Sequence, residues 1–348
     1  MKSLVSRINQ DIAGIAGRLL NTRVKALRPA RPSGNNRVFR IETSDGVYAA
    51  KSYGHSAAEA APRLATEYSA LLVLSDAGGM AIPKPIARDD QAHIGIYEWV
   101  PGEPVSSIGP HEISAASQFV TRLSEVSAAC TGETIGPARE ACFSGEEIVR
   151  QIGTRIERLA TAADSSALTE FLENAMAPVL AMAKTRGCDG LGDAAFSADV
   201  PIGRRVLSPS DFGLHNALRR RDGSIVFIDF EYFGWDDPVR LTADFLLHPG
   251  MDIAPGARTI FSRKMKGLFG HRGDDDYDFT SRLDLLYPLV GLRWCAILMN
   301  EFLPERWARR VFAGEKRDRE AVLQDQLDKA HRMLDRVRDA LEGYADGK

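Results

Sequence analysis

Two aspartates and one asparagine stand at a spacing that suits the transfer of a phosphoryl group. Asn216 follows Asp211 by five positions, and Asp229 follows Asp211 by eighteen. A carboxylate placed like Asp211 orients or takes the proton of an attacking hydroxyl, and asparagine and aspartate oxygens are ligands that Mg²⁺ prefers. Phosphoryl transfer depends mostly on positioning and charge neutralisation, so it needs such groups in one cluster. We therefore expect Asp211 to be the catalytic base, and Asn216 and Asp229 to be metal ligands.

The segment between Asn216 and Asp229 predicts the fold-back that brings these side chains together. The dipeptide Asp222-Gly223 is a strong signal for a tight hairpin turn, and short apolar runs flank it. Such a hairpin returns Asp229 to the side of Asn216. Glu231 lies two positions beyond Asp229, on the same face of an extended strand. It is a further candidate metal ligand, either directly or through a water molecule.

The bulk composition narrows the class of protein. The chain has 348 residues, 44% of them hydrophobic, which is enough for a large core and suggests two domains or lobes. Its 44 basic and 47 acidic residues give a net charge of −3, so no general attraction to nucleic acid or an anionic membrane is expected. Four widely spaced cysteines without a CxxC pattern are typical of reduced thiols. No signal-peptide core and no run of roughly 20 apolar residues is apparent, so we expect a soluble cytoplasmic protein.

The apolar patterns change along the chain. Five short strands are indicated in the first hundred residues, at 24–27, 37–42 and 47–51, then one after the prolines at 83 and 85, and one at 94–100, with one helical pattern over 57–76. Beyond residue 110 the patterns are mostly helical, covering 112–129, 145–160, 166–184, 238–248, 257–269, 279–303 and 316–343. The sequence therefore predicts a small β-rich lobe followed by a larger helical one.

The last predicted helix has an apolar stripe with alternating spacings of four and three, formed by Leu323, Leu327, Ala330, Leu334, Val337 and Leu341. The stripe suits a coiled-coil seam between two copies, and it equally suits a helix packed on its own lobe. Its short length favours the second interpretation. Both a monomer and a homodimer remain open.

The ordered motifs resemble those of the aminoglycoside phosphotransferase and choline kinase-like family, small-molecule kinases that share the protein kinase-like fold. The resemblance covers roughly residues 20–300. It implies an α+β fold with two lobes, in which residues 1–100 form a nucleotide-binding lobe with a small antiparallel sheet and one helix. Residues 101–348 then form a mostly helical lobe with the catalytic loop and the acceptor pocket. The implied cofactors are ATP, with GTP as an alternative, and Mg²⁺; the implied partner is a small-molecule hydroxyl acceptor.

The resemblance also implies which side chains hold the nucleotide. Lys51 ends a predicted strand where the family places the lysine that contacts the α- and β-phosphates. Glu67 stands where the family has the helix carboxylate that pairs with this lysine. Glu59, two turns earlier, is the competing carboxylate, but Glu67 is preferred because it adjoins the core-facing residues Leu64 and Tyr68.

Backbone groups complete the expected nucleotide site. Glycine and asparagine tolerate conformations that point backbone N–H groups at phosphate oxygens, although many such clusters are ordinary hairpin turns. The cluster that resembles the nucleotide-positioning turn of the family is Ser33, Gly34, Asn35 and Asn36. Glu98 and Val100 resemble the hinge whose backbone binds the adenine edge.

One position departs from the family pattern. The family usually has a histidine two residues before the catalytic aspartate, where this chain has Pro209. That histidine mostly supports the loop, so its loss does not by itself imply inactivity. His215 occupies a different point of the loop and is a poor substitute. The departure leaves a second interpretation, a nucleotide-binding pseudokinase with a regulatory or scaffold role.

Substrate candidates follow the catalytic segment. Trp235 and Trp294 suit an aromatic wall for a cation or a sugar, and they suit the protein core as well. Arg293 is a charge within an apolar helix, which requires pairing with a structural carboxylate or with an anionic group of the substrate. Asp244 matches the family aspartate that braces the catalytic loop. A protein acceptor is disfavoured because the residues after Asp229 leave almost no room for an activation loop.

Overall fold

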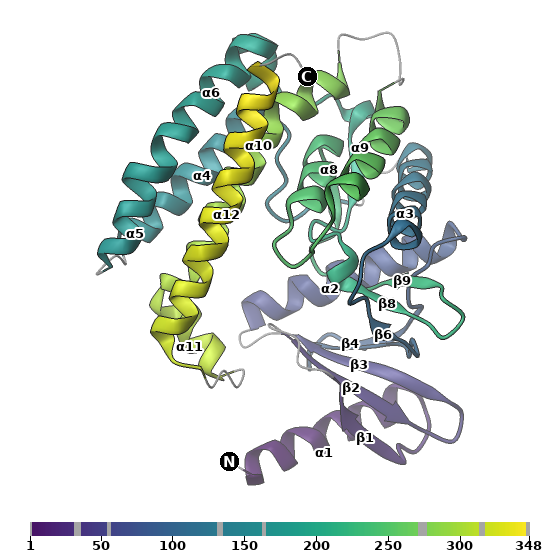
Figure 1. Ribbon diagram of the computed structural model, residues 1–348. Coiled ribbons are helices and arrows are strands. Elements are labelled where there is room, and N and C mark those ends of the chain that lie inside the picture. Colours follow the sequence, from purple (N-terminus) through teal and green to yellow (C-terminus); the bar gives the residue numbers. More distant parts are fainter. Residues whose placement is uncertain are drawn as a thin grey trace.

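The strands of the N-terminal lobe form one antiparallel sheet (Figure 1). A computed structural model of the chain describes residues 2–30, 36–53, 57–130, 135–161, 165–270, 277–312 and 317–345. The sheet has the order β1-β2-β3-β5-β4, with β1 (Ala26–Pro29), β2 (Asn36–Glu42), β3 (Val47–Tyr53), β4 (Pro85–Asp89) and β5 (Ile94–Glu98). Successive residues of β3 point to opposite faces, so Ala50 and Lys51 face different sides of the sheet.

A helix lies against each face of this sheet. Helix α1 (Lys2–Leu19) packs Ile12 and Ala16 on the face that carries Ala50, and it lies at the end of the molecule away from the C-terminal lobe (Figure 1). Helix α2 (Ala57–Asp76) contacts β3, β4 and β5 from the other side and carries Glu67. The sequence analysis expected only α2. It missed α1 because charges that interrupt an apolar run also form the polar side of an amphipathic helix.

The C-terminal lobe is mostly helical, as the resemblance implies. Its helices are α3 (Pro110–Ala129), α4 (Gly145–Ala160), α5 (Ser166–Glu170), α6 (Ala177–Leu191), α7 (Asp193–Ser197), α8 (Pro238–Leu247), α9 (Pro255–Phe269), α10 (Phe279–Leu298), α11 (Pro304–Phe312) and α12 (Arg319–Ala345). Single tighter or wider turns occur at Phe171–Met176, Ile202–Arg204, Leu214–Asn216 and Met299–Phe302. The short helices α7 and α11 were not expected. The α+β, two-lobed fold is confirmed.

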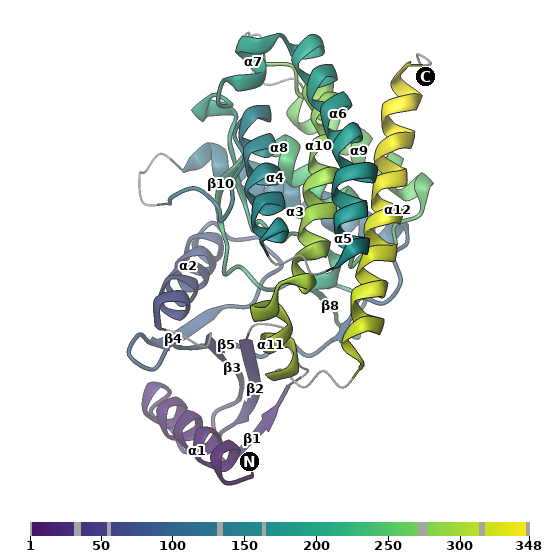
Figure 2. The ribbon, with the colours of Figure 1, turned by 90° about the vertical axis from the view of Figure 1, so that its left-hand side faces the viewer.

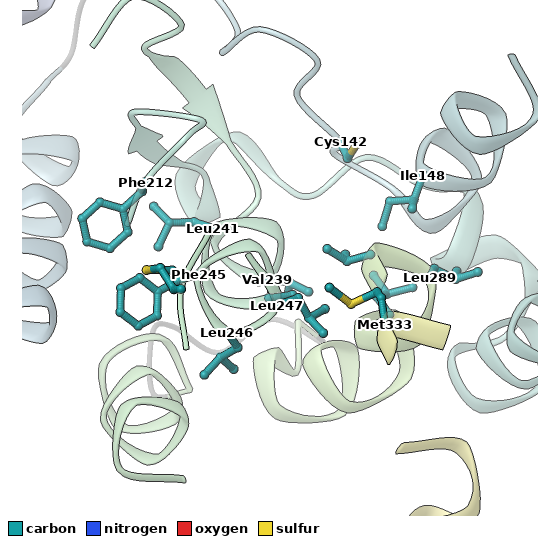
Figure 3. Packing of buried hydrophobic residues seen from close by; sticks show 14 of the residues in the cluster. Cys142, Ile148, Phe212, Val239, Leu241, Phe245, Leu246, Leu247, Leu289 and Met333 are labelled. Carbon is teal, nitrogen blue, oxygen red and sulfur yellow. The ribbon is translucent and has the colours of Figure 1, made fainter. Parts of the chain in front are cut away.

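Helix α10 is the centre of this lobe. It packs against α4, α6, α8 and α12, and Figure 3 shows Leu289 of α10 in one buried cluster with Leu247 of α8 and Met333 of α12. The segment Phe279–Phe302 is long and apolar enough to cross a membrane by length and composition, but 72% of its apolar window is buried inside the protein. Its burial among four helices makes it a core helix.

The apolar stripe of α12 faces α10, so the packing interpretation holds for this helix. Figure 2 shows α12 along one side of the C-terminal lobe. The stripe residues Leu327, Ala330, Leu334, Val337 and Leu341 are buried there. A coiled-coil seam between two copies would need this same face, which the protein's own core already covers.

This packing predicts a clear stability difference on α12. Leu334→Ala is expected to lower the free energy of unfolding by about 2–5 kcal/mol, because it removes a fully buried side chain and leaves a cavity. The exposed position Asp339 on the same helix provides the control, since Asp339→Ala should stay within about 0.5 kcal/mol of the wild type. Urea unfolding measures both. Equal effects at the two positions would contradict the buried seam.

The remaining strands position the catalytic segment. Strand β7 (Val206–Ser208) pairs with β10 (Gly234–Asp236), and β8 (Ala217–Arg219) pairs with both β6 (Glu103–Pro104) and β9 (Ile225–Phe227). The predicted hairpin is present between β8 and β9, and its turn residue Gly223 has a φ of 87°, a conformation that glycine adopts without strain. The N–H of Ile228 donates to the Asn216 carbonyl at 2.9 Å, which brings Asp229 next to Asn216.

Candidate active site

A cleft of about 720 Å³ between the two lobes collects most of the predicted site residues. Its lining includes Asn36, Lys51, Glu67, Glu98, Val100, Asp211, Asn216, Asp229 and Glu231. Ser33, Gly34 and Asn35, which were predicted to position the nucleotide, lie outside the described residues. The cleft therefore brings together residues from β2, β3, α2, β5 and the catalytic segment.

Lys51 is the cation at the centre of an acidic cluster. Its Nζ lies 2.6 Å from Glu67 Oε2, 2.6 Å from Asp229 Oδ1 and 3.6 Å from Glu231 Oε2. Burial alone would lower the pKa of the Lys51 ammonium, but Asp229, Glu67 and Glu231 outweigh it and raise that pKa well above its usual value. Lys51 is therefore charged at every working pH. The competing carboxylate, Glu59, pairs with Arg63 instead.

Glu67 ties the lysine to the catalytic segment. Its Oε2 also accepts a hydrogen bond from the Tyr53 hydroxyl at 2.6 Å, and its Oε1 accepts one from the Phe230 N–H at 3.3 Å. A carboxylate that is only 5% exposed needs such partners to offset the cost of its desolvation. One side chain of α2 thus fixes both Lys51 in β3 and the backbone that follows Asp229.

Asp229 and Glu231 differ in their surroundings although they are two residues apart. The Asp229 side chain is 29% exposed to the cleft, and its φ of 72° lies in the left-handed region, where aspartate is tolerated better than most residues. Glu231 is 3% exposed; its Oε2 accepts from Asn36 Nδ2 at 2.6 Å, and its Oε1 lies 3.7 Å from an Arg63 nitrogen. Asn36 Oδ1 is buried and has no hydrogen-bond partner among the described residues. The metal-ligand roles of both carboxylates stay predictions.

The catalytic loop is anchored on both sides of Asp211. Ser210, whose φ is 68°, donates its N–H to Ser208 Oγ and its hydroxyl to the Arg139 carbonyl. On the other side, the Phe212 ring is buried and stacks on Phe245 of α8 at 5.4 Å (Figure 3). A loop held by a strand end and a buried ring keeps the intervening carboxylate in one place.

Asp211 receives three side-chain contacts while remaining open to the cleft. Its Oδ1 lies 3.2 Å from the Nε2 atoms of His215 and His248, and Asn216 Nδ2 donates to its Oδ2 at 3.2 Å and to its carbonyl at 3.0 Å. Burial alone would raise the pKa of Asp211, but the hydrogen bonds from the two histidines outweigh it and hold that pKa well below its usual value. The side chain is 40% exposed. An ionised carboxylate of this kind suits the orientation of a hydroxyl.

Asn216 is oriented by the same contacts. Both bonds from its amide nitrogen go to Asp211, so its amide oxygen is the atom that points elsewhere and is suited to a metal. The predicted grouping of Asp211, Asn216 and Asp229 in one cleft is therefore what the structure contains.

Sequence reasoning missed two residues of α8 that hold the loop. Arg240 is 3% exposed, pairs with Asp236 and Asp244, and donates to Ser210 Oγ at 3.1 Å. His248, at the end of the same helix, contacts Asp211. The spacing of four between Arg240, Asp244 and His248 was a usable signal, because such residues share one helix face. His215, which the sequence analysis discounted, also reaches Asp211.

The three predicted substrate residues are not among those that line the described cleft. Trp235 lies in β10 and packs on the core of the C-terminal lobe, and Trp294 donates its indole N–H to Asp244 at 2.9 Å. Arg293 is 2% exposed; it donates to Gln151 at 3.0 Å and to Glu140 at 2.8 Å. The sequence left open whether Arg293 pairs with a structural carboxylate or with an anionic group of the substrate, and in the structure it pairs with Glu140. The substrate contacts of these three side chains stay predictions, and the hydrogen bonds of Trp294 and Arg293 go to other residues of the C-terminal lobe.

Comparison with known proteins shows the family to which this chain belongs. The model of the phosphotransferase enzyme family matches residues 27–240. A search of curated protein sequences gives no match. Three solved structures share the fold at low sequence identity and nearly full coverage.

The aminoglycoside phosphotransferase APH(2'')-IIa in complex with gentamicin has 13% identity and a TM-score of 0.59, over 92% of this chain and 95% of its own. The spectinomycin phosphotransferase APH(9)-Ia in complex with ADP and spectinomycin has 12% identity and a TM-score of 0.58, over 93% and 98%. The choline kinase LicA from Streptococcus pneumoniae has 15% identity and a TM-score of 0.53, over 94% and 99%. Since the family model covers more than half of its length, the chain belongs to the phosphotransferase enzyme family.

Proposed function

We propose that the protein transfers the γ-phosphate of ATP, in the presence of Mg²⁺, to a hydroxyl group of a small molecule. The observation that carries the proposal is the grouping of Lys51, Asp211, Asn216 and Asp229 in the cleft between the lobes. A cation for the phosphates, oxygen ligands for a metal and a carboxylate for the hydroxyl are the parts that phosphoryl transfer needs. Family membership and the ADP complex of a structural neighbour support the same activity.

Lys51 is the group that would hold the α- and β-phosphates. Its ammonium is positioned by Glu67, and its raised pKa keeps the charge in place. The backbone near Glu98 and Val100, where β5 ends at the cleft, would meet the adenine edge. A hinge that binds through its backbone also admits guanine, so GTP is the alternative donor.

The donor set in the cleft fits Mg²⁺. Lys51 and Arg63 face the three carboxylates of Glu67, Asp229 and Glu231, so the cluster keeps surplus negative charge that a divalent cation can neutralise. Asp229 and the amide oxygen of Asn216 would hold the ion, with Glu231 as a further ligand. The ion supplies charge neutralisation at the phosphate oxygens.

Asp211 would orient the acceptor hydroxyl toward the phosphate. Its low pKa makes it a weak proton acceptor before transfer, whereas its open carboxylate can accept the hydroxyl hydrogen bond and fix the direction of attack. The bond between the γ-phosphate and ADP then breaks as the acceptor oxygen bonds to phosphorus, and the hydroxyl proton passes to the Asp211 carboxylate late in the transfer, as expected for a loose transition state.

The acceptor is a small molecule, and we propose an amino alcohol or a sugar ahead of an aminoglycoside. The structural neighbours named above include a choline kinase and two antibiotic phosphotransferases, so the fold alone does not choose between these classes. We further propose a cytoplasmic enzyme, monomeric or homodimeric, that has neither nucleic acid nor a membrane as its partner.

An ADP-release assay tests the proposal. Mg-ATP is supplied with amino alcohols, aminoglycosides, free sugars or nucleosides, and each reaction is run beside Asp211→Asn. Release that one class stimulates and the variant lacks would support a small-molecule kinase and identify its acceptor chemistry. ATP binding without turnover for any class would favour the pseudokinase.

Metal dependence is a separate expected result. Mg²⁺ should tighten ATP binding to the wild type by roughly tenfold or more, since a contact between charged groups contributes about 1.5–3 kcal/mol. Asp229→Asn should lose most of this gain, because it removes one charged ligand. Calorimetric titration of ATP with Mg²⁺ and with a chelator measures both. An unchanged Mg²⁺ effect in Asp229→Asn would argue against this ligand assignment.

A further inference from the structure

The catalytic carboxylate is held by a residue outside its own loop. His215 and His248 stack with ring centroids 3.7 Å apart and an angle of 4° between the rings, and both place Nε2 3.2 Å from Asp211 Oδ1. His215 belongs to the loop, but His248 follows the last residue of α8. Its side chain is 13% exposed, so the contact with Asp211 is largely shielded from water. A shielded hydrogen bond to a charged group is stronger than an exposed one.

The tautomer of His248 follows from its second nitrogen. The N–H of Gly250 donates to His248 Nδ1 at 3.0 Å, so Nδ1 carries a lone pair and the ring proton lies on Nε2. That proton points at Asp211 Oδ1. Burial lowers the pKa of His248, which keeps the ring neutral near pH 7. His248 is therefore a fixed hydrogen-bond donor to the carboxylate.

Helix α8 and its neighbour α10 hold this donor in place. One face of α8 has a functional side chain every four residues, at Arg240, Asp244 and His248. Arg240 donates to Ser210 Oγ, next to Asp211. Asp244 accepts from the indole of Trp294 in α10, and that indole meets the His248 ring edge-on at 4.7 Å. One face of α8 thus contacts two consecutive residues of the catalytic loop.

A metal site at these side chains conflicts with the same geometry. The ligand atoms of Asp211, His215 and His248 lie within 4.8 Å of one another, a spacing that a metal could use. Ligation through His248 Nε2 would require the ring proton on Nδ1. A proton on Nδ1 would point at the N–H of Gly250, so two hydrogen-bond donors would face each other without an acceptor. The arrangement therefore fits hydrogen bonding to the carboxylate.

We propose that His248 is the positioning residue of Asp211, and that it performs from α8 the support which the family obtains from the histidine that Pro209 replaces here. The proposal rests on the proposed function, in which Asp211 orients the acceptor hydroxyl. His248 and the loop residue His215 occupy Oδ1, and Asn216 occupies Oδ2, so the carboxylate has one orientation; it remains 40% exposed on the cleft that it lines.

The first test reads the imidazole rings directly by nitrogen NMR of the full-length protein near pH 7. We expect the proton of His248 on Nε2, and we expect Asp211→Asn to shift that Nε2–H signal because its acceptor loses its charge. The exposed His331 on α12 should not respond. A proton on Nδ1, or a His248 signal that ignores Asp211→Asn, would overturn the proposal.

The second test uses kinetics with Mg-ATP and the acceptor that is most active in the ADP-release assay. His248→Ala should lower kcat roughly 10- to 100-fold, as removal of an orienting partner does, with KM for ATP within about twofold. His248→Gln keeps an N–H donor that can reach the same oxygen and should recover kcat to within about threefold of the wild type. His331→Gln is the matched control and should be unchanged.

Equal losses in His248→Ala and His248→Gln would mean that ring packing alone matters, and this would contradict the proposal. So would a raised KM for ATP with an unchanged kcat. If the wild type turns over no acceptor, the proposed function fails, and the imidazole spectrum then decides on the contact between His248 and Asp211 by itself.

Discussion

Asp211→Asn is expected to lower kcat for phosphoryl transfer by roughly 10²- to 10⁴-fold, the range that general acid–base groups contribute. Asparagine has the same shape, and its one side-chain oxygen can still accept from His215 and His248. It loses the bond from Asn216 Nδ2 to Oδ2, but Asn216 still donates to the backbone carbonyl of residue 211, so the loop should keep its conformation. The variant loses the negative charge that orients the attacking hydroxyl and receives its proton. Steady-state ADP release with the active acceptor measures the effect.

The affinity for ATP separates this effect from damage to the fold. Lys51, which would hold the phosphates, pairs with Glu67, Asp229 and Glu231 and its described ion pairs do not include Asp211, so the Kd of Mg-ATP should change by no more than about threefold. Retained transfer in Asp211→Asn would remove this residue from the mechanism. A parallel loss of ATP binding would show that the loop, and not the charge, had changed.

Lys51→Met should weaken both the protein and the reaction. Lys51 is 9% exposed and pairs with Glu67, which is 5% exposed, so the substitution leaves a buried carboxylate without its cation. Breaking a buried ion pair in this way costs about 3–5 kcal/mol of folding free energy. Loss of the phosphate contact should also lower kcat/KM by roughly 10²- to 10³-fold, the size that one electrostatic donor contributes.

A second substitution separates the loss of folding free energy from the loss of activity. Lys51→Met combined with Glu67→Gln removes the unpaired charge of Glu67; the single glutamine oxygen can still accept from the Phe230 N–H, and its amide N–H can donate to the Tyr53 hydroxyl. We expect the double variant to recover most of the folding free energy and none of the activity. Urea unfolding and ADP release measure the two quantities. Recovery of activity in the double variant would contradict the role of Lys51 at the phosphates.

The core of the candidate site was predictable because its signals are local. Asp211, Asn216 and Asp229 are linked by one hairpin, and the Asp222-Gly223 turn encodes that hairpin within a few residues. The pairing of Lys51 with Glu67 followed from family positions and is present at 2.6 Å.

Contacts between distant segments were not predictable in the same way. His248 reaches Asp211 only because α8 packs behind the loop, and a loop motif does not contain that information. Trp294 and Arg293 had the residue types of a binding pocket, yet in the folded lobe Trp294 donates to Asp244 and Arg293 donates to Glu140. Helix α1 was missed because its pattern was compared only with a signal peptide.

The most direct measurement of the central claim follows the phosphate itself. The protein is incubated with Mg-ATP carrying an isotopic label in the γ-phosphate and with the mixed panel of amino alcohols, sugars, nucleosides and aminoglycosides, and the products are analysed by mass spectrometry. The account predicts labelled phosphoester on one small-molecule class, absent with Asp211→Asn. Label that stays in ATP although ATP is bound, or that appears only in inorganic phosphate, would contradict it.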